Sequence, residues 1–472
     1  MQLILTSPLV AARLAWQVQR MEWRAMGGAQ RAWMRAGLPA ELRPLGAGLC
    51  SALLGQLCTI QDAAGAPCWW GYVHAVTLDE GGSKQRLALD RLANRVAALY
   101  PLPDGGWART AWAEDSLSLA QWGRREHLLK CPAEGESGAA AARDALLARS
   151  AQPRWTASIG VQPRESEAVL AIEARGWWDC LDWTYFAPGG GRIEHAFSGG
   201  AGQPLGDQPA NTRIAQSFRL AGESWPAGEA WLKIGKRGSP ADALRLELCA
   251  DSGGTPGAAL AAAEIEAAAV PHASGWLRFE LPGQLLAADT PYWLALRRTG
   301  ALDAENHYSL LADEQQGYPG GECRLWNGQA WSARQPPADL NFRVDGLQPF
   351  GEWLTALVGG NGRFNSARLD CATSLAALRW RDGRRTCRME LEERLAVGGL
   401  IAEVEADRGV SVRQRPLEDE IEGYLQGEAI LTRTGQAWPA SRPLAGRWVR
   451  AGAAAVWAEH VVWEDEMLKM EE

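Results

Sequence analysis

The 472-residue sequence contains little of what catalytic, metal-binding and dinucleotide-binding proteins require. None of the GxSxG, HExxH, P-loop or dinucleotide-binding motifs occurs in it. Histidine is scarce, and no two of the six histidines have the spacing of a metal-ligating pair; they are His74, His127, His195, His272, His307 and His460. The sequence therefore predicts no catalytic residues, no cofactor and no metal site.

Long apolar runs are also absent. No stretch of about 20 apolar residues occurs, and the first residues lack the basic start and apolar core of a signal peptide. We therefore expect that no segment spans a membrane and that the protein is made in a cytoplasm. The nine cysteines are odd in number and form no CxxC motif, which argues against a zinc cluster or a dense disulfide framework. We expect them to be reduced and to pack as small core residues.

Positive charge is in slight deficit, because the formal net charge is −8. Proteins that bind nucleic acid through its phosphates need clustered Lys and Arg, so we expect no sequence-specific nucleic-acid binding. One local exception is the arginine-rich stretch 379–388, which is followed at once by Glu390, Glu392 and Glu393. This pattern fits either a solvated face or a contact between subunits.

Turn-forming residues and tryptophan are abundant, with 52 glycines, 25 prolines and 24 tryptophans. Frequent Gly and Pro favour many short strands over long helices. Tryptophan buries a large area and also needs a partner for its N–H, so it is enriched at interfaces. The excess indicates either assembly surfaces or compositional bias combined with core packing.

The first part of the chain alternates between short apolar segments and turns, which predicts an antiparallel meander. We assign residues 1–125 to a first β-barrel, with strands expected at 3–5, 58–60, 69–76, 86–90 and 96–100. A helix is expected at 114–123, where Asp115 or Ser116 can cap the start and Gly123 can end it. Residues 126–154 form a helical connector, with a second helix at 138–149.

A change of composition at Pro188–Gly191 marks a flexible joint. Beyond it, strict alternation at Leu244–Leu248 places three leucines on one face of a strand and two charges on the other. Further strands follow at intervals of roughly 10–20 residues with almost no helix, which is typical of a sandwich. We therefore expect residues 192–345 to form an antiparallel β-sandwich inserted into a second barrel.

That second barrel comprises residues 155–191 and 346–472. Strands are expected in it at 156–161, 168–174, 400–405, 409–412, 428–432 and 447–449. A helix is expected around Cys387–Leu395, where three apolar side chains recur every four residues and Gly398 and Gly399 stop the helix. The fold class is thus mainly β, with two barrels, a few short helices and an inserted sandwich.

One group of residues in the sandwich has the character of a ligand platform. Tyr318, Trp326, Asn327 and Trp331 lie in a Gly-rich stretch. Exposed aromatic faces can stack on a sugar ring, and an amide can bond its hydroxyls. The alternative is that these aromatic residues form the core and edge of the last hairpin, so both interpretations stay open.

Several stretches resemble the tail-tip or baseplate hub proteins of long-tailed bacteriophages: Trp23 with Gly27–Gly28, 58–65, 69–73, 87–96, 112–126 and 444–449. The resemblance covers about 1–185 and 348–465 and includes no catalytic motif. It implies two β-barrels related to the tail-tube fold and a non-enzymatic virion protein of the tail tip that is synthesised in the host bacterial cytoplasm. Three copies would form a ring, with the tail-tube or distal tail protein and tip or fibre proteins as partners.

The inserted segment separately resembles small jelly-roll modules that look like carbohydrate-binding domains. The residues that carry this likeness are 215–218, 236–240, 251–257 and 290–294. The resemblance makes a host-surface glycan a candidate ligand. It also leaves a second hypothesis, in which the chain is an adhesin-like carbohydrate-binding protein mounted on the tail.

Overall fold

The computed structural model describes residues 1–6, 14–102, 107–132, 135–159, 168–185, 191–197, 200–315, 317–371, 375–379, 383–418, 420–426, 429–439, 444–464 and 467–471. The chain is mainly β, with short helices. It divides into two compact units. Unit 1 comprises Met1–Phe186, Leu354–Leu375 and Gly383–Glu472, and unit 2 comprises Ala187–Trp353 and Ala376–Asp382.

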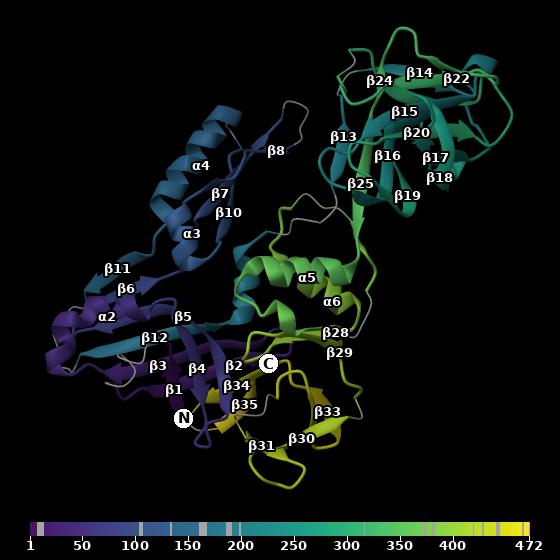
Figure 1. Ribbon diagram of the computed structural model, residues 1–472. Helices are drawn as coiled ribbons and strands as arrows, with labels where there is room; N and C mark the ends of the chain where they lie inside the picture. The colour runs from purple at the N-terminus through teal and green to yellow at the C-terminus, as the bar shows by residue number, and fades with distance from the viewer. Residues whose placement is uncertain are drawn as a thin grey trace. The chain divides into compact units, whose positions relative to one another are not determined.

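A ten-stranded antiparallel sheet organises unit 1, and it combines strands from both ends of the chain (Figure 1). Its main path runs in the order β1 (Gln2–Leu5), β4 (Leu57–Gln61), β5 (Pro67–Asp79), β12 (Val169–Gly176), β3 (Gly28–Gly37), β2 (Gln17–Arg24), β34 (His460–Glu464) and β35 (Met467–Glu471). Strand β6 (Ser83–Ala88) extends from β5, and β11 (Arg154–Ile159) pairs with β6.

Side chains of alternate residues along these strands build one core. On β3, the buried side chains are Ala29, Ala32, Met34 and Ala36, while the intervening residues are less buried. The 3₁₀ helix η1 (Ala40–Leu45) leads into α2 (Gly46–Leu53), which contributes Cys50 and Leu53 to the same core. The core also receives residues of the C-terminal segment, so the two ends of the chain are required together.

A smaller sheet in unit 1 differs from the predicted meander. Strand β7 (Arg95–Pro101) does not extend the antiparallel sheet but pairs in parallel with β10 (Glu126–Lys130). Two short strands, β8 (Trp107–Arg109) and β9 (Ala113–Glu114), also pair with β7. Parallel strands need a crossover connection, and here α3 (Ser116–Trp122) lies within it. Helix α4 (Glu136–Ser150) packs on this sheet through Ala139.

The remaining elements of unit 1 include two small sheets. One contains β26 (Leu369–Cys371), β28 (Leu400–Val404) and β29 (Val410–Gln414), and the other contains β30 (Ile421–Gln426), β31 (Ala429–Thr432), β32 (Trp448–Ala451) and β33 (Ala454–Trp457). The helical elements are η2 (Trp177–Trp183), α5 (Phe350–Asn361), whose first turn lies in unit 2, η5 (Ser366–Arg368) and α6 (Cys387–Val397). Helix α6 lies where its apolar spacing predicts, with Leu391 and Leu395 buried.

Unit 2 is an antiparallel sandwich. One sheet contains β13 (Arg192–His195), β14 (Ala201–Leu205), β16 (Trp225–Arg237), β19 (Gly275–Leu286), β21 (His307–Asp313), β24 (Asp339–Leu340), β25 (Phe342–Gln348) and β27 (Leu378–Arg379). The other contains β15 (Arg213–Arg219), β17 (Leu244–Asp251), β18 (Pro256–Ile265), β20 (Pro291–Arg298), β22 (Cys323–Trp326) and β23 (Trp331–Ala333). The three leucines of Leu244–Leu248 are buried between the sheets, as their alternation predicts.

The structure partitions unit 1 differently from the two barrels expected at 1–125 and at 155–191 with 346–472. Strand β12 lies between β5 and β3, so it belongs to the sheet of the N-terminal strands. The segment 126–154 is not only a helical connector, because β10 pairs with β7. Sequence segments far apart share these sheets, and local strand patterns carry no information about their partners.

Cysteine and tryptophan mostly serve packing. None of the nine cysteines forms a disulfide, and eight are buried. Among the described tryptophans, nine are buried and only Trp107 and Trp155 are clearly exposed. Many half-buried tryptophans lie under arginines, as Trp457 lies under Arg415 at 4.1 Å. The described tryptophans therefore pack mainly inside the two units.

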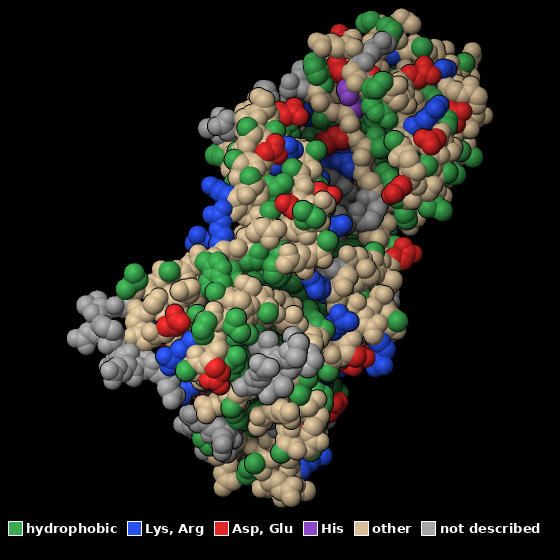
Figure 2. Space-filling model, turned by 60° about the vertical axis from the view of Figure 1, so that its left-hand side comes forward, with side chains coloured by type: hydrophobic (Ala, Val, Ile, Leu, Met, Phe, Trp, Pro, Cys, Tyr) green, Lys and Arg blue, Asp and Glu red, His purple; other side chains and the backbone are tan. Residues whose placement is uncertain are grey.

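In the part of the chain that the structure describes, no helix combines the length and the apolar character needed to cross a bilayer. Figure 2 shows basic and acidic side chains interspersed on the visible face.

Candidate functional site

Trp326 and Trp331 of the predicted glycan platform are brought together by the hairpin of β22 and β23. They are direct cross-strand partners, with ring centroids 5.4 Å apart and ring planes at 56°. Both side chains are half-buried. Trp331 packs on a small buried cluster of Ala215, Cys249, Trp293 and Ala295. The pair therefore combines packing with an accessible aromatic surface.

Asn327 follows Trp326 in the exposed turn of this hairpin. Its Oδ1 accepts hydrogen bonds from the backbone N–H groups of Gln329 (3.0 Å) and Ala330 (2.9 Å). The side-chain oxygen thus holds the turn, a common use of Asn. Only the side-chain NH₂ group remains to meet a ligand.

Tyr318 packs on the other face of this sheet, against the inner core of the sandwich. Its ring lies edge-on to Phe342, with centroids 5.1 Å apart, and its hydroxyl accepts a hydrogen bond from the Arg219 N–H at 3.4 Å. Burial raises the pKa of this hydroxyl. The four predicted residues therefore do not form one platform, since Tyr318 lies apart from the tryptophan pair.

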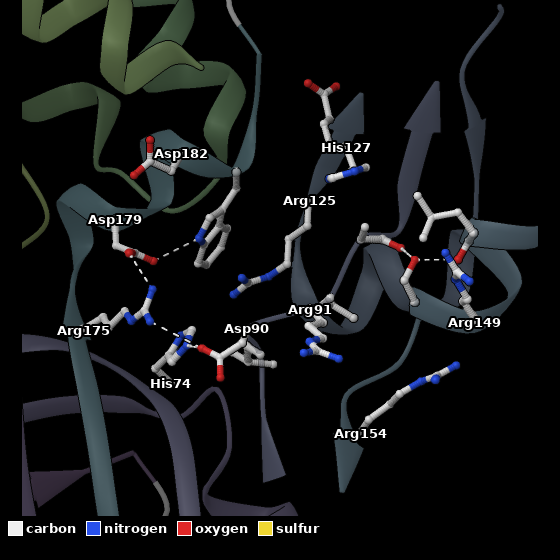
Figure 3. Close-up of a pocket in the computed structure, with 17 residues that line it drawn as sticks. His74, Asp90, Arg91, Arg125, His127, Arg149, Arg154, Arg175, Asp179 and Asp182 are labelled. Atoms are coloured by element: carbon white, nitrogen blue, oxygen red, sulfur yellow. Dashed lines mark hydrogen bonds and ion pairs between the residues drawn. The ribbon is translucent and has the colours of Figure 1, made fainter. Parts of the chain in front are cut away.

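A polar cavity in unit 1 is the second candidate site (Figure 3). It has a volume of about 820 Å³. Strands β5 and β12, the turn after β6, the loop before β10, helix α4 and η2 supply its walls. The charged and imidazole side chains that line it are His74, Asp90, Arg91, Arg125, Glu126, His127, Arg149, Arg154, Arg175, Asp179 and Asp182.

One wall of the cavity is a closed ion network. His74 is 2% exposed, and its Nε2 lies 2.5 Å from Asp90 Oδ1. Asp90 also accepts hydrogen bonds from Arg86 and from Arg175, the latter at 3.4 Å. Arg175 in turn donates to Asp179 Oδ1 at 3.1 Å. These contacts fix the turn after β6 against β5, β12 and η2.

The network sets the protonation of its members. Burial lowers the pKa of His74, and the Arg175 guanidinium adds to this effect. Burial opposes ionisation of Asp90, but hydrogen bonds from His74 and Arg86 outweigh it and lower its pKa from 3.8 to about 2. At Asp179 burial is likewise outweighed, chiefly by Arg175, and the pKa is lowered. At neutral pH this wall therefore holds two carboxylates and an uncharged imidazole.

The buried Arg125 also lines the cavity. Its guanidinium stacks on Trp183, with the Cζ atom 3.5 Å from the ring centroid. It is 5% exposed, and its Nε has no hydrogen-bond partner. Burial lowers its pKa, although Tyr72 and Asp179 act in the opposite direction.

Sequence reasoning did not predict this cavity, although its signal was present. Two stretches noted for their resemblance to hub proteins, 87–96 and 112–126, contribute Asp90, Arg91 and Arg125 to it. Their remaining partners come from α4, β12 and η2. No spacing rule links these segments, so the cluster arises only from the fold.

The described residues contain no group of three or more His, Cys, Asp or Glu side chains placed to hold a metal ion.

The His74–Asp90 pair has the form of a catalytic dyad. Its imidazole Nδ1 is buried without a hydrogen-bond partner. The hydrogen bonds that His74 and Asp90 make are the ones that build the ion network.

Comparisons with known proteins assign no family. No protein-family model matches the chain, and no curated protein matches it in sequence. Among solved structures, the Cry4Aa toxin of Bacillus thuringiensis is 6% identical with a TM-score of 0.17, over 63% of this chain and 51% of the toxin, so the chain spans about half of that protein.

Two infectious bursal disease virus structures are also similar in part, namely the VP2 subviral particle and the Gt strain structure. Both are 10% identical over 70% of this chain, with TM-scores of 0.17 and 0.18 and coverage of 79% and 76% of the viral chains. TM-scores this low carry no argument about fold family or function.

Proposed function

We propose that the chain is a structural, non-catalytic protein of a bacteriophage tail tip or baseplate hub. It forms a homo-oligomeric ring, a trimer by the hub resemblance, that connects the tail tube to the tip in the virion. The stretches that resemble hub proteins contribute to the sheets of unit 1 and to its polar cavity. Unit 2 is then a module carried by the ring.

Strand β11 is the observation that supports self-assembly. All six of its described residues are exposed, including Trp155 at 42% and Ile159 at 87%. Its only strand partner among the described residues is β6. An exposed edge strand with apolar side chains is a template for pairing with another chain. A neighbouring copy in a ring would cover this strand.

The test is the mass and shape of the purified full chain, by native mass spectrometry and electron microscopy. We expect a closed ring with a central hole, and we expect W155E/I159K in β11 to abolish it because charge on an edge strand opposes pairing. Leu117→Lys is the matched control, since Leu117 is 80% exposed on α3 of the same unit. A chain that stays monomeric both in solution and in assembled tails would refute the proposal.

Glycan recognition by unit 2 is a second candidate function, supported by the half-buried pair of Trp326 and Trp331. Aromatic rings that stack on a sugar give shallow, weak binding, which several copies of the chain in a ring would strengthen. The same tryptophan pair also supports the alternative in which the chain is chiefly an adhesin-like, carbohydrate-binding protein mounted on the tail.

Binding to an array of bacterial surface polysaccharides tests this function. We expect W326A and W331A each to weaken binding at least tenfold with little change in melting temperature. W276A is the matched control, because Trp276 is a half-buried tryptophan of the other sheet. A lower melting temperature with unchanged binding would instead make the pair core residues. If neither quantity changes, unit 2 is a spacer.

A further inference from the structure

The polar cavity of unit 1 has an excess of unpaired positive charge. Each of its carboxylates is already engaged. Asp90 and Asp179 belong to the ion network, Asp182 pairs with Arg388 at 3.1 Å, and Glu126 pairs with Arg95. Among the described residues, no carboxylate lies within 4.0 Å of the guanidinium of the remaining arginines, which are Arg91, Arg125, Arg149 and Arg154.

Arg125 is the most informative of these four. Arg125 is only 5% exposed, and burying a guanidinium without a paired carboxylate is costly. Stacking on Trp183 and a hydrogen bond to the Tyr72 oxygen compensate in part, while the Tyr72 hydroxyl donates its own proton to Asp179. Nε still lacks a partner. A bound anion would compensate this buried charge, so an anion is the ligand that the cavity is expected to hold.

The other three arginines are exposed around the same cavity. Arg91 comes from the turn after β6, Arg149 from the last turn of α4, and Arg154 from the first residue of β11. In Figure 3 their guanidinium groups lie on the same side of the ion network as Arg125, at separate positions. A single small ion cannot meet all of them, whereas a ligand with several charged groups can.

We propose that this cavity binds a small phosphorylated anion that carries two or more phosphoryl charges. Arginine binds phosphate oxygens through paired N–H donors, and its charge does not titrate in the physiological range. Arg125 holds one phosphoryl group at depth, and Arg91 and Arg154 hold another nearer to solvent. The volume of about 820 Å³ is sufficient for a ligand of this size. The inference does not depend on ring formation.

Isothermal titration of the full chain with pyrophosphate and tripolyphosphate at low salt tests the proposal. We expect saturable binding at one site per chain, tighter for these probes than for orthophosphate or citrate. R91Q/R154Q should weaken pyrophosphate binding at least tenfold without a change in melting temperature, because both side chains are exposed and have no acidic partner among the described residues. R35Q/R219Q removes the same charge from exposed sites elsewhere and should bind like the parent chain.

Arg125→Met gives a second, independent readout. If Arg125 awaits an anion, this variant should lose binding while its melting temperature stays the same or rises, because an uncompensated buried charge is removed. The proposal is overturned by an absence of saturable pyrophosphate binding, by equal losses in R91Q/R154Q and R35Q/R219Q, or by citrate binding as tightly as pyrophosphate. Each of these outcomes leaves the test of ring formation unaffected.

Discussion

Asp90 joins β5, β6 and β12 through a single carboxylate. It accepts hydrogen bonds from His74, Arg86 and Arg175, and these contacts lower its pKa to about 2. A carboxyl group whose pKa is lower in the folded state stabilises the fold above its unfolded pKa of 3.8. That contribution is lost progressively as the pH falls from about 4 towards 2.

We therefore predict that Asp90→Asn destabilises unit 1 at pH 7 by about 1 kcal/mol. This value is smaller than the free energy that corresponds to the full pKa shift, because the carboxylate is more than a third exposed and solvent screens its contacts. The difference from the parent chain should shrink below pH 4 in calorimetric melts. Glu80→Gln, at an exposed residue near β6 with no ion pair, is the control. A difference that stays constant down to pH 3 would contradict the linkage.

The candidate site was predictable only where its residues are neighbours in sequence. Trp326 and Trp331 face each other because a short turn between two strands dictates it. Tyr318 is also close in sequence, but it packs on the opposite face of the sheet, and nothing in its local pattern indicates that face. Arg125 lines the same cavity as His74 and Arg175 through tertiary structure alone, so the cavity could not be predicted.

Helix α3 shows how local chemistry sets the start of an element. The sequence offers Asp115 and Ser116 as alternative caps, and the structure selects Asp115, whose carboxylate accepts from the Ser118 N–H at 2.8 Å. Gly123 then ends the helix with a φ of 76°, a conformation that favours glycine.

We predict that Asp115→Ala destabilises unit 1 by about 1 kcal/mol, which is the usual cost of losing a cap. Asp115→Ser should retain most of this stability because a hydroxyl can accept the same hydrogen bond. Ser116→Ala, one residue further on at an exposed position, should be neutral. Urea denaturation of the three variants measures these differences, and equal losses in D115A and S116A would show that the cap has been misassigned.

Strands were predictable where large apolar residues alternate with charges, as at Leu244–Leu248. Strands β2 and β3 were not predicted. The buried face of β3 is mainly alanine, which has high helix propensity and little apolar surface, so its alternation gives a weak strand signal. Helix α5 was missed as well, since it ends in glycines that usually indicate a turn.

The whole chain consists of an inserted sandwich and a host unit assembled from both sides of the insertion. Strand composition alone indicates a mainly β protein with a separate module, because the sandwich has its own uninterrupted alternation. The pairing of strands within unit 1 could not be inferred, because it depends on contacts between residues that lie more than 100 positions apart, and more than 400 for β2 and β34.

The pairing of β2 with β34 has a consequence for biosynthesis. Arg24 lies opposite His460, about 436 residues later. At roughly 5–20 residues per second, a ribosome needs between about 20 and 90 seconds to supply that partner. During this interval the β2 edge is open to other nascent chains on the same messenger.

Folding of unit 2 reduces the entropic cost of closing the loop between β2 and β34. Its first strand, β13, and its last long strand, β25, are antiparallel neighbours that place Arg192 opposite Asp345. Once the sandwich has folded, the chain leaves it beside the point where it entered. About 150 residues are then removed from the loop that must close, a favourable but small gain, since halving a flexible loop is worth only about 0.6 kcal/mol. The insertion therefore delays the arrival of β34, but once folded it adds little to the thermodynamic cost of closing the sheet.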